Sequence, residues 1–307
     1  MSFTTTVKNE VSKLELSVLE KIAQLSAIIR NSSYKTDIKI VTENASVARQ
    51  IFSLIKDLYK ITPLITVRKG INYQKKYLYI LQIKKSNNIL SDVGLLNGEI
   101  LNIPLEYITD DEESLRAYLR GLFIMTGSIN DPKKSRYHLE FLVDDEQYAN
   151  YVCKMLNKYY LNSKVLKKEN KYMIYIKEAE KIGDFLRIIN AYNAVMYYED
   201  IRIYRDHKNM TNRLNNCEQA NIDKVIETSN EQLKDINLII DTVGLDLLDE
   251  KEQIVIDYRL KYNDASLLEL SEIIGIETGK KITKSGLYHR FKKIKDLASK
   301  IRENTKQ

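Results

Sequence analysis

The sequence predicts an α+β protein in which a helix–strand–helix–strand–strand unit occurs twice and an all-α region with a helix-turn-helix layout follows. The first observation is that apolar spacing changes in the same order in residues 4–83 and 114–176. The second is that apolar patterns after residue 230 all have helical spacing. The third is that residues 276–307 carry ten Lys and Arg against three acids, a surplus of seven in a chain whose net charge is +6.

Composition limits the class of protein. The chain has 307 residues, 44% of them hydrophobic, which is enough for about two packed domains. No apolar run approaches the roughly 18 residues of a membrane span, and the first residues lack the pattern of a secretory signal. Cys153 and Cys217 form no CxxC, so we expect neither a zinc site nor a disulfide framework. We therefore expect a reduced, cytoplasmic protein with no membrane partner.

The first copy of the unit begins with a long amphipathic pattern. Val11, Leu14, Val18 and Ile22 recur at steps of three and four residues. Asn44 is the expected N-cap of the second helix. The predicted elements are helix 4–31, strand 36–42, helix 45–60, strands 64–68 and 77–83, and a short helix within 86–96.

The second copy has the same order of elements. Its first helix contains the apolar run LRGLFIMTG (119–127), and residues 127–132 are expected to form a turn. The predicted elements are helix 114–125, strand 137–143, helix 146–160, strands 164–168 and 172–176, and helix 182–189.

Local matches indicate a duplication. The pattern I-x3-I-x3-Y beginning at Ile51 recurs as V-x3-L-x3-Y from Val152, an offset of 101 residues. The first helices, compared at Leu25 and Leu119, are offset by 94 residues. The second copy therefore holds seven extra residues, for which NDPKKSR (130–136) is the natural place. A chance agreement between two α/β segments is the alternative.

Residues 193–230 are rich in Asn and Arg and contain neither Gly nor Pro, which predicts a stiff helical bridge. Helices are then expected at 232–243, 249–261, 266–274 and 283–301. The basic end of the chain suits a polyanionic partner, although a solvated charged helix would have the same composition.

Residues 264–291 have the layout of a helix-turn-helix. Asp264 or Ser266 caps a first helix that runs to Gly275, and a turn lengthened by residues 276–282 follows. Thr283 or Ser285 then caps a second helix, whose basic outer face suits DNA phosphates and base edges. An ordinary three-helix bundle with a basic face is the alternative. The candidate DNA-binding residues are Lys284, Ser285, Tyr288, His289, Arg290, Lys292 and Lys293.

Five stretches carry a family resemblance: LSAIIRNSS (25–33), TENASVARQIF (42–52), YLRGLFIMTGSINDPKKSRYHLEF (118–141), NRLNNCEQAN (212–221) and ITKSGLYHRFKKI (282–294). They span nearly the whole chain, and together they resemble the WhiA family of bacterial regulators. The resemblance implies a pseudo-two-fold LAGLIDADG homing-endonuclease-like domain joined to a C-terminal helix-turn-helix akin to a promoter-reading region of sigma factors. It also implies double-stranded DNA as a partner and roles in cell division, chromosome segregation and, in spore formers, sporulation.

The two copies of the unit, the bridge and the helical end together set the expected domain limits. These are 1–100 and 101–192 for the two LAGLIDADG-like halves, 193–230 for the bridge and 231–307 for the helix-turn-helix domain. The Asn212–Asn221 motif belongs to the resemblance, and we assign it no chemical role.

The resemblance also raises the question of a nuclease site. LAGLIDADG enzymes place one metal-binding acid at the end of each interface helix. The alignment puts these two places at Ser32 and Thr126, which supply no anionic ligand. Asp37 and Asp131 lie five residues further on and could replace the missing acids, but Asp131 also suits an Asn-Asp-Pro turn. We expect a non-enzymatic protein with no catalytic residue, metal or cofactor; a metal-dependent endonuclease is the alternative.

The predicted strands of the first half are basic, because residues 54–90 hold eight Lys and Arg against one acid. Outward-facing Lys on strands would contact phosphates without reading sequence. They could instead protect exposed edges from pairing, or bind a transcription or division protein. The candidate contacts are Arg68, Lys69, Lys75, Lys76 and Lys168.

No other pattern points to chemistry. His138, His207 and His289 share no metal-ligand spacing, and the chain has no P-loop and no GxGxxG. The leading prediction is a DNA-binding transcriptional regulator associated with the nucleoid. A protein-binding adaptor that uses the nuclease-like domain is a further alternative.

Overall fold

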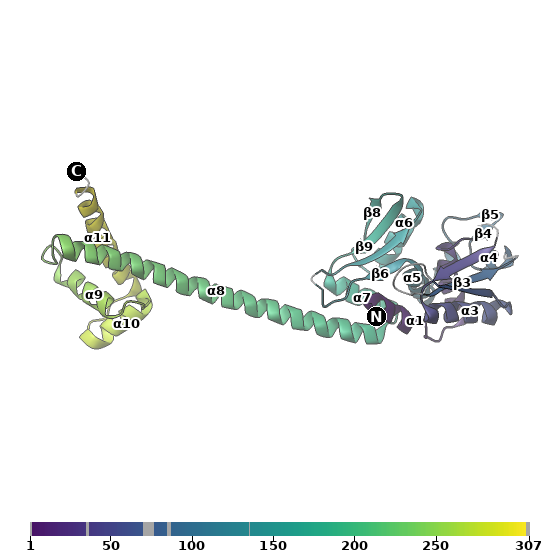
Figure 1. Ribbon diagram of the computed structural model, residues 1–307, viewed down its shortest axis with the longest axis horizontal. Coiled ribbons are helices and arrows are strands. Elements are labelled where there is room, and N and C mark those ends of the chain that lie inside the picture. Colours follow the sequence, from purple (N-terminus) through teal and green to yellow (C-terminus); the bar gives the residue numbers. More distant parts are fainter. Residues whose placement is uncertain (1, 35–36, 70–76, 85–86, 135, 305–307) are drawn as a thin grey trace. The chain divides into compact units, whose positions relative to one another are not determined.

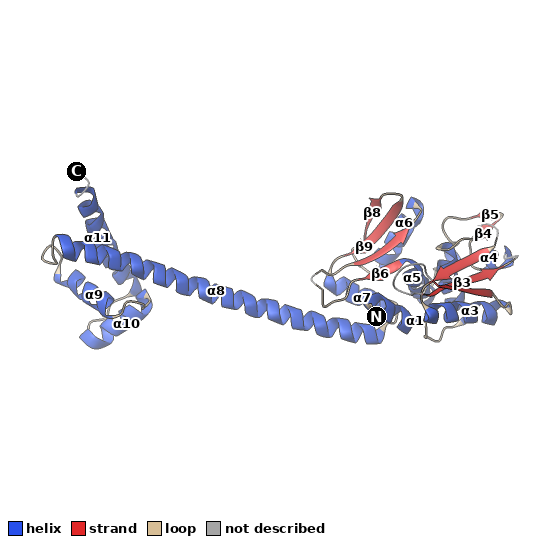
Figure 2. Cartoon of the chain, in the orientation of Figure 1, coloured by secondary structure: helices blue, strands red, loops and turns tan. Residues whose placement is uncertain are grey.

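The computed structural model describes residues 2–34, 37–69, 77–84, 87–134 and 136–304. The chain forms two compact units, Met1–Asp206 and His207–Gln307. The first unit combines helices and antiparallel sheets, and the second unit is entirely helical in its described residues (Figures 1 and 2). None of the described helices is long and apolar enough to cross a membrane.

The first unit begins with two helices where the sequence predicted one. Helix α1 covers Phe3–Val11 and helix α2 covers Val18–Arg30. Between them, the Ser17 hydroxyl accepts the Glu20 N–H at 3.3 Å, and the Glu20 carboxylate accepts the Ser17 N–H at 3.0 Å. This capping box starts a new helix inside a continuous apolar pattern, so the prediction of a single helix over 4–31 is wrong.

Helix α2 packs against helix α5 (Glu112–Thr126), and this pair joins the two halves of the unit. Gly121 allows their close approach, because a Cβ at this position would lie 2.4 Å from the Gln24 carbonyl oxygen and 3.0 Å from the Ala27 Cβ. Both Ala27 and the neighbouring Leu119 are fully buried. The sequence pattern in these two runs therefore encodes a tight helix interface.

Each half carries one main antiparallel sheet. The first has the order β1-β3-β2, with β1 at Ile38–Thr42, β2 at Leu64–Lys69 and β3 at Tyr77–Ile83. The second has the order β6-β7-β9-β8, with β6 at Gly127–Ile129, β7 at Leu139–Val143, β8 at Lys164–Lys168 and β9 at Lys171–Ile176. Strands β7, β8 and β9 thus repeat the order and pairing of β1, β2 and β3, as the duplicated unit predicts.

Strand β6 is an addition that the sequence did not predict. Gly127 has an extended backbone (φ −76°, ψ 141°), so the chain passes directly from α5 into a strand that pairs with β7. Only residues after Ile129 form the predicted turn. The corresponding place in the first half has a single bridge between Ser33 and Lys39.

Further helices cover one face of each main sheet (Figure 1). Helix α3 (Ala45–Tyr59) begins at Asn44, whose side chain accepts the N–H groups of Ser46 and Val47, as predicted. The other elements of this unit are α4 (Asn87–Asp92), β4 (Leu96–Asn97), β5 (Glu99–Ile100), the 3-10 helix η1 (Glu106–Ile108), α6 (Glu146–Lys158) and α7 (Ala179–Ile188).

Helix α8 runs without a break from Tyr192 to Thr242, a length of 51 residues. The sequence predicted a bridge over 193–230 and a separate helix from 232, and this separation is wrong. No Gly or Pro interrupts residues 193–243, so the backbone has no reason to leave the helix.

The second unit comprises the end of α8 with α9 (Glu250–Lys261), α10 (Leu267–Thr278) and α11 (Lys284–Asn304). Its core is formed by apolar side chains from all four helices. They include Ile236, Ile239, Val255, Ile256, Leu270, Ile274, Leu287, Phe291, Ile294 and Ala298.

Candidate nucleic-acid interface

Helices α10 and α11 form the predicted helix-turn-helix arrangement. Ser266 caps α10 in a capping box with Glu269. The helix then continues through Gly275 and ends at Gly279, which has a left-handed backbone (φ 69°). The predicted end at Gly275 is therefore wrong, because the glycine that stops the helix is the later one.

The start of α11 is fixed by Thr283, whose hydroxyl accepts the Gly286 N–H at 3.1 Å. Leu287, Phe291 and Ile294 are buried in the core of the second unit, as the apolar spacing predicted. This packing determines which side of α11 faces outward. The candidate residues exposed there are Lys284, Ser285, Tyr288, His289 and Lys292.

Two other candidates contact helix α9. The Lys293 ammonium lies 3.0 Å from the Glu252 carboxylate, and a hydrogen bond to this carboxylate raises the pKa of Lys293. The Arg290 guanidinium donates to the Lys251 carbonyl at 3.4 Å. Glu252 is itself buried and accepts the Asp249 N–H. Lys293 and Arg290 therefore help to hold α11 against α9, whereas no acidic partner occurs for Lys284 or Lys292 among the described residues.

Buried Arg259 stabilises the connection that precedes α10. Its guanidinium donates to the Ala265 carbonyl at 2.6 Å, and the guanidinium Cζ lies 5.4 Å from the centre of the Phe291 ring. It also donates to Ser229 of α8 at 3.3 Å. The sequence did not single out this residue, since only the folded structure brings α8, α9 and α11 around it.

Helix α11 also packs on α8 within the second unit. Lys295 lies 3.5 Å from Glu231, and Arg302 lies 2.6 Å from Asp235. A small cavity between these helices is lined by Thr228 of α8 and by Tyr288 of α11, among others. The first turns of α11 therefore lie beside the point at which α8 joins the bundle.

The two degenerate catalytic positions end their helices in the same way. The Ser32 hydroxyl donates to the Ile28 carbonyl at 2.7 Å, and the Thr126 hydroxyl donates to the Leu122 carbonyl at 3.0 Å. Both hydroxyls thus bond to the carbonyl four residues earlier, a local bond that competes with the helix backbone. Neither position holds an ionised side chain that could bind a divalent metal.

The two downstream acids have local partners. The Asp131 carboxylate accepts the Lys133 N–H at 3.0 Å, which is the turn that the Asn-Asp-Pro sequence predicted. The Asp37 carboxylate accepts from the Gln82 side chain at 3.1 Å. Within the described residues, no three His, Cys, Asp or Glu side chains lie together in a way that could hold a metal ion.

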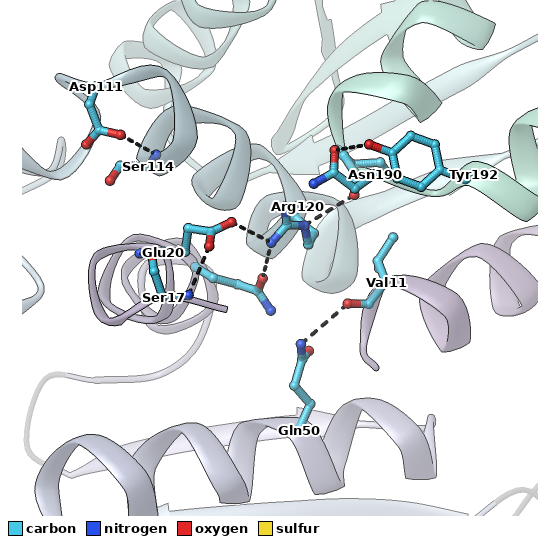
Figure 3. Close-up of polar contacts among 11 residues, drawn as sticks. Val11, Ser17, Glu20, Gln50, Asp111, Ser114, Arg120, Asn190 and Tyr192 are labelled. Atoms are coloured by element: carbon cyan, nitrogen blue, oxygen red, sulfur yellow. Dashed lines mark hydrogen bonds and ion pairs between the residues drawn. The ribbon is translucent and has the colours of Figure 1, made fainter. Parts of the chain in front are cut away.

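A buried arginine lies at the centre of the α2–α5 interface (Figure 3). Arg120 is fully buried and donates to the Ile189 carbonyl at 3.2 Å and to the Gln24 side chain at 3.4 Å. Its guanidinium lies 3.7 Å from the Glu20 carboxylate. Desolvation lowers the pKa of Arg120, and Glu20 opposes this effect. Arg120 was not among the residues predicted from the sequence, although an arginine inside an apolar helix run was a visible signal.

Arg120 and Ser26 occupy the same position in the two copies of the interface run. Ser26 donates to the Val93 carbonyl at 2.7 Å, just as Arg120 donates to the Ile189 carbonyl. Val93 follows α4, the helix after β3, and Ile189 follows α7, the helix after the equivalent strand β9. The two halves therefore use an equivalent bond with different side chains, and both bonds are structural.

The candidate sheet residues are distributed over both halves. Arg68 and Lys69 are exposed on β2, and Lys168 is exposed at the end of β8. Strand pairing places Arg68 opposite Leu78, on the sheet face that points away from helix α3. Lys75 and Lys76 lie outside the described residues. Apolar Val41, Leu64 and Leu166 are exposed near these cations, with exposed fractions of 40%, 61% and 51%.

Three family models match the chain in sequence order. Residues 12–96 match the WhiA N-terminal LAGLIDADG-like domain, residues 115–208 match the WhiA LAGLIDADG-like domain, and residues 211–298 match the WhiA C-terminal HTH domain. Together these matches cover most of the chain, and they follow the duplicated unit and the helical unit described above.

Relatives and solved structures agree with these matches. The chain is 41% identical over 313 residues to the "Probable cell division protein WhiA" of Enterococcus faecalis, covering 99% of this chain and 100% of that protein. It is also 41% identical over 312 residues to the protein of the same name from Bacillus cytotoxicus, covering 98% of each.

The similarity to solved structures concerns the fold. Full-length DUF199/WhiA from Thermotoga maritima covers 98% of this chain and 99% of its own, with a TM-score of 0.58 and 24% identity. An N-terminal LAGLIDADG domain of DUF199/WhiA covers 61% of this chain and 90% of its own, with a TM-score of 0.51 and 24% identity. The duplicated α+β unit, the helix-turn-helix arrangement and the full-length identity to curated relatives thus show that this chain belongs to the WhiA family.

Proposed function

We propose that this protein is a non-enzymatic transcriptional regulator that binds double-stranded DNA through helix α11. The observation that carries the proposal is the combination of a fixed inner face and a basic outer face on this helix. Leu287 and Phe291 anchor the helix in the core, while Lys284 and Lys292 are exposed and have no acidic partner among the described residues. The Thr283 cap sets the first turn, whose free backbone N–H groups attract phosphate.

The outer face of α11 also offers groups that can distinguish bases. Ser285, Tyr288 and His289 are exposed near the start of the helix, where a recognition helix contacts base edges. Ser and His side chains can donate to or accept from base edges in the major groove. Lysine contacts with phosphates would supply affinity, and these polar side chains would supply sequence preference.

The proposal assigns a structural role to the LAGLIDADG-like halves. Ser32 and Thr126 replace the metal-binding acids, and their hydroxyls bond to their own helices. Without two opposed carboxylates, the usual two-metal hydrolysis of a phosphodiester has no ligands at these places. The proposed parts of the chain are scaffold halves 1–100 and 101–192, bridge 193–230 and DNA-binding domain 231–307.

The biological part of the proposal follows from the family. A WhiA-type protein that binds DNA would regulate genes of cell division or chromosome segregation, and of sporulation in spore-forming bacteria. Such a protein would be found with the nucleoid. This assignment rests on the names of the relatives and on the proposed chemistry of α11.

A salt-titrated binding measurement on the full-length protein tests the proposal. The probe is a fluorescent 40-base-pair duplex selected by the wild-type protein from a random-sequence pool. The double variant K284A/K292A should bind at least about tenfold more weakly, and its affinity should depend less steeply on salt because two phosphate contacts are lost. The double variant K295A/K300A is the matched control, since it removes two charges further along the same helix. Equal losses in both variants would show that the first turns of α11 are not the specific DNA contact.

A second candidate function is protein binding by the outward faces of the two sheets. Exposed Val41, Leu64 and Leu166 favour it, because DNA-binding faces seldom present several aliphatic side chains to phosphate. An L64D/L166D variant separates the two functions. Protein binding predicts that this variant loses activity in cells while its DNA affinity stays unchanged, whereas a reduced DNA affinity would assign the sheets to DNA.

A further inference from the structure

One stretch of α8 has an unusual surface that the proposed function does not use. Residues 207–217, HKNMTNRLNNC, contain no acid, whereas five acids occur between residues 218 and 235 of the same helix. All side chains from 206 to 224 are exposed. The acid-free stretch carries two cations and four asparagines.

Asparagine lowers the stability of an exposed helix relative to most other polar residues. Its helix propensity is below that of Lys, Arg, Gln and Glu, which would solubilise the surface equally well. Five Asn nevertheless occur between residues 209 and 221. Of the four within the acid-free stretch, Asn209, Asn212 and Asn216 lie on one side of the helix with Arg213, because they are three or four residues apart. Solvation alone does not explain this choice of residues.

The Asn209, Asn212, Arg213 and Asn216 side chains are here called the amide stripe. At 3.6 residues per turn, Arg213 lies directly in line with Glu231, and Asn209 and Asn216 lie within about 60° of that line. Positions 213, 216, 220, 224, 227 and 231 follow one another at steps of three or four residues. Glu231 at the end of this series contacts Lys295 of α11, and Asp235 one turn later contacts Arg302. The stripe therefore adjoins the exposed edge of the α8 face that contacts α11, in line with the Glu231–Lys295 ion pair.

The spacing along α8 suits a duplex bound at the start of α11. Thr228 lies beside Tyr288 in the cavity between the two helices. Asn216 is twelve residues before Thr228, which is about 18 Å along a helix. The major groove is roughly 12 Å wide, so a helix arm of about 18 Å is long enough to reach the sugar–phosphate strand that borders the groove.

We propose that the amide stripe on α8 is a second contact with the same DNA duplex, and that it binds the sugar–phosphate backbone beside the groove occupied by α11. The Arg213 guanidinium can donate two charge-assisted hydrogen bonds to one phosphate. The Asn amides can donate to phosphate oxygens without adding charge. Ala220, the next residue along this face, leaves room for close approach. This inference rests on the proposed DNA binding by α11.

The experiment compares two double variants of the full-length protein on the selected 40-base-pair duplex. R213A/N216A removes one cation and one amide from the stripe. K208A/N215A removes the same residue types from the same stretch, but on another side of α8. Both variants replace Asn by Ala, which favours the helix, and far-ultraviolet circular dichroism should show unchanged helix content.

We expect R213A/N216A to bind about tenfold more weakly, with a salt slope lower by about one, and K208A/N215A to bind within about twofold of wild type. Hydroxyl-radical footprinting should show lost protection at one edge of the site only. Equal behaviour of the two variants would overturn the inference. If K284A/K292A abolishes binding while R213A/N216A binds normally, DNA binding by α11 is supported and the role of the amide stripe is rejected. If the wild-type protein selects no duplex, both proposals are rejected.

Discussion

The interface helices α2 and α5 and the terminal helix α11 differ in where their polar groups point. In the interface pair, the Arg120, Ser26 and Thr126 side chains all bond to backbone carbonyls of the protein. On α11, Lys284 and Lys292 are exposed. A polar group whose bonding capacity is used inside the fold stabilises the structure, whereas an exposed and unpaired cation is available for a partner. By this criterion the first region is architectural, and the second is the proposed recognition surface.

The strongest test of the architectural role is the substitution Gly121→Leu. Its side chain would overlap the Gln24 carbonyl oxygen on a helix that cannot move without disturbing the core. We expect the free energy of unfolding to fall by about 3 kcal/mol or more, as measured by urea denaturation. Gly275→Ala is the matched control, since nothing lies within 4 Å of its added Cβ, and it should stabilise helix α10 by up to about 1 kcal/mol. If G121L had the same free energy of unfolding as wild type, the α2–α5 pair would not be tightly packed.

The next largest effect is expected for Arg120→Met. This change removes the bonds to Ile189 and Gln24 and leaves Glu20 without its cation. Glu20 keeps its capping role at Ser17, so we expect a loss of about 2–3 kcal/mol rather than complete unfolding. DNA affinity of the folded variant should stay unchanged. A large loss of DNA affinity at full stability would instead give Arg120 a role in recognition.

Two adjacent lysines on α11 differ in whether they have an acidic partner. Lys293 pairs with Glu252, whereas Lys292 is exposed without such a partner. We expect Lys292→Ala to weaken DNA binding about three- to tenfold and Lys293→Ala to weaken it less than about twofold, as measured by fluorescence anisotropy. The opposite order would mean that DNA displaces Glu252 and recruits Lys293.

The last prediction concerns the pH dependence of stability. Burial lowers the pKa of Lys8 to about 8, and its ammonium lies 5.7 Å from the centre of the Phe123 ring on α5. Because the folded pKa is below the unfolded value, the unfolded state binds more protons between about pH 8 and 10.5, and stability rises with pH there. The Lys8→Met variant should be more stable than wild type at pH 7, and this advantage should shrink by pH 10. A constant difference would show that Lys8 stays protonated when folded.

Much of the fold follows from short-range patterns. The Asn44 cap, the alternation in the strands and the apolar spacing of α11 each depend on residues close in sequence, so they were predictable. Strand β6 was missed because Gly127 and its neighbours resemble a turn until their pairing with β7 is known. The start of α2 was missed because the Ser17 capping box lies inside an unbroken apolar pattern.

The candidate site was predictable only in part. The inner and outer faces of α11 follow from its sequence, but the pairing of Lys293 with Glu252 joins residues 41 positions apart. The role of Arg120 was hidden for the same reason, since its acceptor Ile189 is 69 positions away. Similarly, Arg213 shares its side of α8 with Glu231, whose partner Lys295 is 64 positions away.

Cross-linking mass spectrometry of the wild-type protein on its selected duplex is the most direct test of DNA binding through α11. After ultraviolet irradiation and digestion, peptides that carry a covalently attached nucleotide identify the surface in contact with DNA. If α11 binds DNA, such peptides should come from residues 284–293, with Tyr288 the leading site. Nucleotide attached only to peptides of β2 or β8, with α11 unmodified, would contradict it.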